Sequence, residues 1–202
     1  MITIVSYGVG NLGSMLNMFK RLGVPARAEA DPDAIRAARK LVLPGVGAFD
    51  AAMARIEAVP GLREALDHQA LVARVPVLGV CLGMQLLTRG SEEGVRPGLG
   101  WLAADTRRFP RQPGLKVPHM GWNLVEEATP SPLTRNLGDE PRYYFVHSYH
   151  VAVDDPADAL LRAHHGVAFE AAIGRGNVFG VQFHPEKSHR FGMRLLQNFA
   201  EL

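Results

Sequence analysis

The only cysteine of the chain stands in a pattern typical of a nucleophile. Cys81 lies between Gly79 and Gly83, where the strand-like run Val77–Val80 meets the helical run Leu82–Leu87. In hydrolases the same Gly-x-nucleophile-x-Gly spacing makes a sharp strand-to-helix turn that keeps bulk away from the nucleophile. A helix N-terminus also favours the thiolate, which is the reactive form. Because free cysteine is among the most buried residue types, a structural role stays open unless a base is found.

A candidate base and its orienting group occur near the carboxyl end. His184 and Glu186 flank Pro185 after the apolar run Val178–Phe183, which predicts a strand ending in His-Pro-Glu. Residues two apart in extended chain point to the same side, so both side chains are expected to face one site. Pro185 also keeps the preceding residue away from helical backbone. An isolated His-x-Glu is more often structural, so it is the conjunction with Cys81 that predicts a nucleophilic triad for amide hydrolysis.

The remaining histidines give no metal-binding pattern, because none forms a pair with a second cluster of donors. We predict no metal site and surface or structural roles for four of them: His68, His164, His165 and His189.

The composition is that of an ordinary soluble globular protein. The chain has 202 residues, 47% hydrophobic and 21% charged, which is in the range of one domain. Its formal charge is only +2 without a long single-sign run, so no nucleic-acid partner is expected. A single free thiol suits a reducing cytosol. The amino terminus does not resemble a signal peptide, and the longest apolar-rich run, Val75–Leu87, is too short to span a bilayer. We expect a cytoplasmic protein without membrane contact.

The order of the predicted elements indicates an α/β fold. In the first half, short apolar runs alternate with helical patterns, which predicts βαβ units and a parallel sheet. These runs are Ile2–Val5, Leu12–Leu22, Leu41–Leu43, Ala48–Ile56, Val77–Val80 and Leu82–Leu87. From Trp101 onward, strand-like pieces separated by Pro and Gly favour antiparallel or mixed pairing. They are Asn123–Glu126, Arg142–Val146, Val151–Val153, Leu160–His164, Ala168–Ile173 and Val178–Phe183, followed by a helix over Phe191–Phe199. We predict one domain over residues 1–202.

These residues resemble the triad glutamine amidotransferases, whose glutaminase domains carry Gly-x-Cys-x-Gly-x-Gln and a late His-Pro-Glu. Further segments are similar to one branch, the glutaminase subunits of imidazole glycerol phosphate synthase in histidine biosynthesis. They are Tyr7–Leu12, Leu43–Phe49, Pro118–Asn123 and Tyr143–His150. Pro44-Gly-Val-Gly47 distinguishes this branch, because sibling glutaminases usually have Pro-Gly-Gly or Asn-Gly-Pro there. The resemblance covers essentially the whole chain.

The resemblance implies a flavodoxin-like triad amidotransferase fold, a central mixed, mostly parallel sheet flanked by helices, and no cofactor. It implies an oxyanion hole formed by Gly45, Val46, Gly47 and Leu82. Substrate contacts are implied for Gln85, Glu93, His147, Ser148 and Tyr149. Contacts with a partner protein are implied for Asn11, Ser14, Trp122, Tyr144 and Lys187.

By the same resemblance, L-glutamine is the substrate. Attack by the Cys81 thiolate releases ammonia and leaves a glutamyl thioester, which His184 helps water to hydrolyse. In the family the ammonia passes through a tunnel into a TIM-barrel synthase subunit that forms a heterodimer with the glutaminase. Turnover depends on ligand binding to the barrel, so we expect the purified chain to be nearly silent alone.

Three alternatives compete with this interpretation. Gly8, Gly10 and Gly13 form a Gly-x-Gly-x-x-Gly after a strand and before a helix, with Glu29 and Asp31 where a ribose-binding acid is sought, as in nucleotide-binding modules. A lone match of this kind is weak and leaves the cysteine motif unexplained. The second alternative is a glutaminase subunit of another pathway. The third is a catalytically inactive regulatory scaffold.

Overall fold

The core of the fold is a sheet of eight strands in the order β2-β1-β3-β4-β12-β11-β10-β7. The computed structural model describes residues 1–202. The parallel part comprises β2 (Ala26–Glu29), β1 (Ile2–Val5), β3 (Leu41–Gly45), β4 (Val77–Cys81) and β12 (Val178–Val181). The antiparallel part adds β11 (Val167–Arg175), β10 (Ala159–His165) and β7 (Glu126–Glu127). The five parallel strands have the 2-1-3-4-5 order of flavodoxin-type sheets, with β12 in the place of the fifth strand. The predicted fold class is therefore confirmed.

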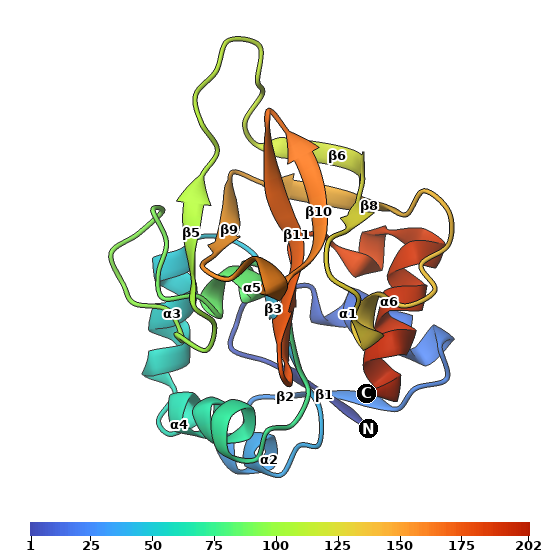
Figure 1. The fold of residues 1–202 in the computed structure, drawn as a ribbon. Helices are drawn as coiled ribbons and strands as arrows, with labels where there is room; N and C mark the ends of the chain where they lie inside the picture. Colours follow the sequence, from blue (N-terminus) through green and yellow to red (C-terminus); the bar gives the residue numbers. More distant parts are fainter.

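Helices cover both faces of this sheet (Figure 1). One face carries α1 (Leu12–Arg21) and α6 (His189–Glu201), and the other carries α3 (Phe49–Ala58) and α4 (Leu62–Asp67). Successive side chains of a strand point to opposite faces. Accordingly Ile4 packs with the α1 and α6 side chains, whereas its neighbour Val5 packs with those of α3 and α4. Each face of the central strands therefore has its own hydrophobic core.

Two antiparallel ribbons and several short helices complete the molecule. The ribbons pair β5 (Ala104–Arg108) with β9 (Tyr149–Val153), and β6 (His119–Leu124) with β8 (Arg142–His147). The short elements are α2 (Pro32–Arg36), the π-helix η1 (His68–Val72), α5 (Leu82–Leu86), η2 (Pro132–Thr134), η3 (Pro156–Asp158) and η4 (Pro185–Lys187). No helix combines the length and the apolar character needed to cross a membrane.

The structure differs from the predicted elements at several places: strands β2 and β5 and helices α2 and α4 were not predicted, and two predicted strands have other bounds. Strand β2 was not predicted, because Ala26–Glu29 is a four-residue edge strand without an apolar run. The predicted strand Asn123–Glu126 is divided between the end of β6 and β7. The strand predicted to lead into His-Pro-Glu ends at Val181, and Glu186 lies in the 3-10 helix η4.

Candidate active site

Cys81 occupies the predicted strained turn between β4 and α5. Its φ of 56° and ψ of −113° are a conformation that side chains rarely adopt. A Cβ on Gly79 would lie 2.5 Å from the Gly83 carbonyl oxygen, and a Cβ on Gly83 would lie 1.9 Å from that of Leu43. The turn therefore packs backbone against backbone, and only glycine fits at both flanking positions.

His184 reaches the same edge of the sheet because β12 lies beside β4. The two strands are parallel, with Val181 opposite Val80, so their carboxyl ends meet. The His184 Nδ1 atom donates to Glu186 Oε1 at 2.9 Å, and both side chains are buried. The predicted neighbourhood of His184 and Glu186 is thus present, but for a different reason. The tight turn of η4, rather than extended backbone, brings the carboxylate to the imidazole.

The electrostatics of this group favour an imidazolium. Burial by itself lowers the pKa of His184, but hydrogen bonds with Cys81 and Glu186, together with their negative charges, outweigh it and raise the pKa to about 9. A charged imidazole beside the sulfur favours the thiolate. The arrangement is therefore suited to nucleophilic attack followed by proton donation.

A cavity of about 410 Å³ opens over the thiol. Its size is that of a small-molecule site. It brings together Cys81, His184 and most residues expected from the resemblance: Val46, Gly47, Leu82, Gln85, Glu93, His147, Ser148, Tyr149 and Lys187. Gly45 does not line it; this glycine is the last residue of β3 and pairs with Cys81 in the ladder. Val46 is 44% exposed at the mouth of the cavity.

Two residues expected to bind substrate are held by the protein itself. Glu93 accepts a hydrogen bond from the backbone N–H of Phe49 through Oε2 at 3.0 Å. The Gln85 amide nitrogen donates to the Tyr149 carbonyl at 3.2 Å and to Gln182 Oε1 at 3.1 Å. Both side-chain N–H groups of Gln85 are therefore used, which leaves its side-chain carbonyl oxygen as the atom that can meet a ligand.

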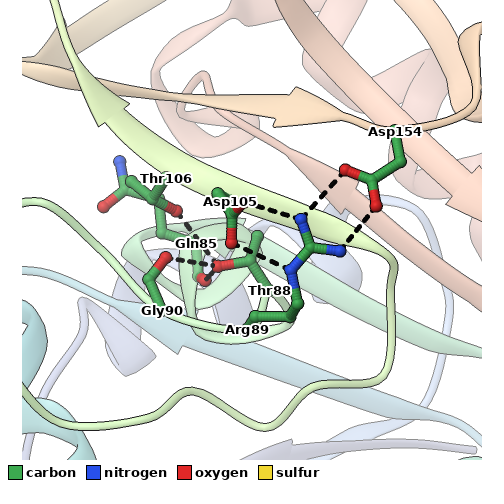
Figure 2. A network of polar contacts seen from close by, with 7 residues as sticks. All are labelled: Gln85, Thr88, Arg89, Gly90, Asp105, Thr106 and Asp154. Atoms are coloured by element: carbon green, nitrogen blue, oxygen red, sulfur yellow. Dashed lines mark hydrogen bonds and ion pairs between the residues drawn. The ribbon is translucent and has the colours of Figure 1, made fainter.

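A polar network fixes the end of α5, and with it Gln85 (Figure 2). The Thr88 hydroxyl lies 2.8 Å from the backbone carbonyl oxygen of Gln85 and 3.2 Å from the Thr106 hydroxyl. The next residue, Arg89, forms bidentate pairs with both Asp105 and Asp154 (Figure 2). The helix is thereby tied to β5 and to the end of β9.

His147 belongs to a chain of neutral histidines that the sequence patterns did not reveal. Its Nδ1 atom donates to the Tyr149 carbonyl at 2.8 Å, so its Nε2 atom accepts from His119 Nδ1 at 2.9 Å. His119 Nε2 accepts in turn from Asn123 at 3.2 Å. Burial lowers the pKa of His147 to about 3 and that of His119 to about 4. The two rings meet because the register of β6 and β8 sets His119 directly opposite His147.

The residues expected to face a partner lie on a surface beside the site. The Trp122 ring stacks on His189 at 5.4 Å and meets Tyr144 edge-on at 6.1 Å, while Lys187 Nζ lies 5.7 Å from the centre of the Tyr144 ring. His189, expected to be surface or structural, thus supports Trp122. Asn11 caps α1 by accepting from the Ser14 N–H at 3.2 Å, and α1 packs against η4.

The glycine-rich turn after β1 packs on the chain's own residues. A Cβ on Gly10 would lie 2.9 Å from the Pro44 side chain, and one on Gly8 would lie 2.4 Å from Arg55. The Asn11 side chain already occupies a donor at the start of α1. A phosphate at this helix N-terminus would have to displace the Asn11 side chain from the Ser14 N–H, so the turn argues against the nucleotide-binding alternative.

Comparison with known proteins places this geometry in a family. Residues 11–202 match the model of "Glutamine amidotransferase class-I". "Imidazole glycerol phosphate synthase subunit HisH 2" of Pseudomonas aeruginosa is 52% identical over 202 residues, with 100% of both chains covered. "Imidazole glycerol phosphate synthase subunit HisH" of Bdellovibrio bacteriovorus is 47% identical over 205 residues, again over 100% of both. The chain belongs to the HisH branch of the class-I glutamine amidotransferases.

Solved structures of more distant proteins share the fold of this HisH-type amidotransferase. The PurLQS structure from Thermotoga maritima has a TM-score of 0.75 at 17% identity, covering 99% of this chain and 97% of its own. A glutamine amidotransferase from the same organism has a TM-score of 0.64 at 21% identity, covering 99% and 82%. At such low identity these likenesses concern the fold alone.

Proposed function

We propose that this chain is the glutaminase subunit of an imidazole glycerol phosphate synthase, with Cys81, His184 and Glu186 as its catalytic residues. Family membership and relatives of the same length at 52% and 47% identity support the activity. The observation that carries the residue assignment is the placement of the strained Cys81 turn beside a buried His184–Glu186 pair, with Cys81 and His184 lining one cavity.

In the proposed mechanism, the Cys81 thiolate attacks the carboxamide carbon of glutamine. Backbone N–H groups of Val46, Gly47 and Leu82 stabilise the developing oxyanion, and protonated His184 delivers a proton to the departing ammonia. Water then attacks the glutamyl thioester while the imidazole takes its proton. Glu186 orients the imidazole and stabilises its charged form. The product is glutamate.

Substitution of the nucleophile tests the assignment. Cys81→Ala should lower glutamate release by at least about 10³-fold, because the covalent route is lost. The assay measures glutamate formed from glutamine in the presence of the synthase partner. Glu201→Gln on the surface of α6 serves as a control that should keep full activity. Near wild-type turnover by Cys81→Ala would remove the thiol from the mechanism.

We further propose that the ammonia passes to a TIM-barrel synthase subunit in a cytoplasmic heterodimer. Ammonia released into bulk water is lost as ammonium, so a direct passage conserves it. A candidate contact surface is the outer side of β6, where Met120, Trp122 and Leu124 are 63%, 46% and 48% exposed. A row of large apolar side chains of this kind marks an interaction site.

Activation by the partner tests this second step. Glutamate release should be low for the chain alone and rise by about 10²-fold or more when a barrel synthase and its nucleotide substrate are added. Full activity of the isolated chain contradicts the coupling. Activation by the synthase of another pathway would favour the glutaminase of that pathway, and failure of a glutamine-like electrophile to label Cys81 in the complex would favour an inactive scaffold.

A further inference from the structure

A buried glutamine lies beside the candidate nucleophile. Strand β12 runs parallel to β4 with Val181 opposite Val80, so the next residue of β12, Gln182, comes beside Cys81. The Gln182 side chain is fully buried, and its amide nitrogen lies 3.9 Å from the Cys81 sulfur. That separation suits a long N–H···S hydrogen bond.

The orientation of this amide follows from its other contact. Gln182 Oε1 accepts from the Gln85 amide nitrogen at 3.1 Å. The Gln85 nitrogen is in turn fixed as a donor by the Tyr149 carbonyl at 3.2 Å. A flipped Gln182 would set two donors against each other. The carbonyl end of Gln182 therefore faces Gln85, and its N–H end faces the sulfur.

We propose that Gln182 is a further catalytic residue, whose side-chain N–H stabilises the Cys81 thiolate. An N–H group stabilises an ionised sulfur more than a neutral thiol, because hydrogen bonds to charged acceptors are the stronger ones. In the second half of the proposed reaction, the bond between the acyl carbon and sulfur breaks. Its electron pair returns to sulfur while His184 takes the proton of water, so the same N–H supports thiolate as the leaving group.

This inference rests on the proposed function for the role of the thiol, but not for the contact itself. The other titratable groups that bear on the sulfur are His184, backed by Glu186, and Tyr7, whose pKa is raised first by burial and next by the charge of Cys81. Glu93 and Lys187 line the same cavity. Gln182 differs from all of them in being an uncharged donor that no pH change removes.

The single cysteine allows a direct test on the purified full chain. The rate of alkylation by iodoacetamide is followed from pH 5 to pH 10, and its midpoint reports the apparent thiol pKa. Gln182→Met removes the donor at similar length and should raise the midpoint by about 0.5 to 1 pH unit. Gln182→Glu should raise it further, because a carboxylate oxygen then faces the sulfur.

A matched control separates this effect from the loss of any buried glutamine. Gln69 is also buried and donates to the Ala38 carbonyl, away from the cavity. Gln69→Met should leave the alkylation midpoint at its wild-type value. A wild-type midpoint in both Gln182 variants overturns the proposal.

A measurement on the wild type keeps the test decisive if the variants fail to fold. The side-chain ¹⁵N resonance of Gln182 should titrate with the midpoint found for alkylation, and a flat titration overturns the proposal. Neither experiment needs glutamine. A shifted midpoint together with unchanged glutaminase activity in Cys81→Ala would therefore reject the proposed function while keeping the Gln182 contact.

Discussion

His184 is buried, so the charge on its imidazole depends on its two neighbours. Burial alone would lower the pKa of this side chain, and only the contacts with Cys81 and Glu186 raise it to about 9. Of the two, Glu186 is the one that can be changed without touching the proposed nucleophile. Its Oε1 atom meets Nδ1 at 2.9 Å, and an amide in its place keeps the shape but not the charge.

We predict that Glu186→Gln lowers the pKa of His184 from about 9 towards its ordinary value of 6.5. The imidazolium, which is the proposed proton donor to ammonia, persists below the raised pKa and is lost as pH rises through it. The alkaline fall of glutaminase activity should thus begin at lower pH in the variant, and kcat should drop by at least about tenfold. NMR titration of the His184 ring measures the shift. A pKa that stays near 9 in Glu186→Gln would assign the elevation to Cys81 alone.

At the scale of elements, the proposed nucleophile is positioned by close packing of α5 on β3. Gly83 sits at this contact, with its Cα so near the Leu43 carbonyl that no side chain fits. Gly13 in α1 offers a contrast, because a Cβ there would meet no atom within 4 Å.

We predict opposite outcomes for alanine at these two glycines. Gly83→Ala should destabilise the fold by about 3 kcal/mol or more, since backbone must move to admit the methyl group. Gly13→Ala should change stability little or increase it by up to about 1 kcal/mol, because alanine favours helix. Urea unfolding followed by circular dichroism measures both. Equal stability of the two variants would mean that the elbow adapts more freely than its packing indicates.

At the scale of the whole molecule, the cavity and the exposed side of β6 are neighbours. Lys187 lines the cavity and also contacts Tyr144, whose ring meets Trp122. A protein that covers Trp122 therefore lies within two side chains of the candidate active site. This proximity gives the proposed partner a physical route to influence turnover.

We predict that Trp122→Ala weakens binding to the synthase subunit by at least about tenfold, as expected for a large aromatic anchor at an interface. Titration calorimetry measures the affinity, and the thermal midpoint confirms that the variant is folded. Val72→Ala is the control, because Val72 is 70% exposed on η1, away from the cavity. Equal affinity of both variants would mean that Trp122 does not lie in the interface.

Local patterns predicted much of this molecule, and the failures have physical causes. Strand β1 was predicted with its observed bounds, because Ile2, Ile4 and Val5 with the β-branched Thr3 form a short run typical of a strand buried on both faces. Edge strand β2 was not predicted, because Ala26-Arg27-Ala28-Glu29 is partly exposed and contains no apolar run. The η4 turn was not predicted, because His-Pro-Glu continues a strand pattern. The fixed φ of Pro185 fits both an extended chain and the first position of a 3-10 helix.

The sequence by itself determined the residue types for the chemistry: one cysteine in a glycine-flanked turn, one late His-Pro-Glu and the order of elements around them. These features are local, because they depend only on residue types, their spacing and the sterics of the neighbouring backbone. Only the tertiary structure decided that β12 pairs with β4, which brings His184 and Gln182 to Cys81 from about 100 residues away. It also decided the pairing of His119 with His147. Such contacts depend on strand order and register, which cooperative packing of both cores selects.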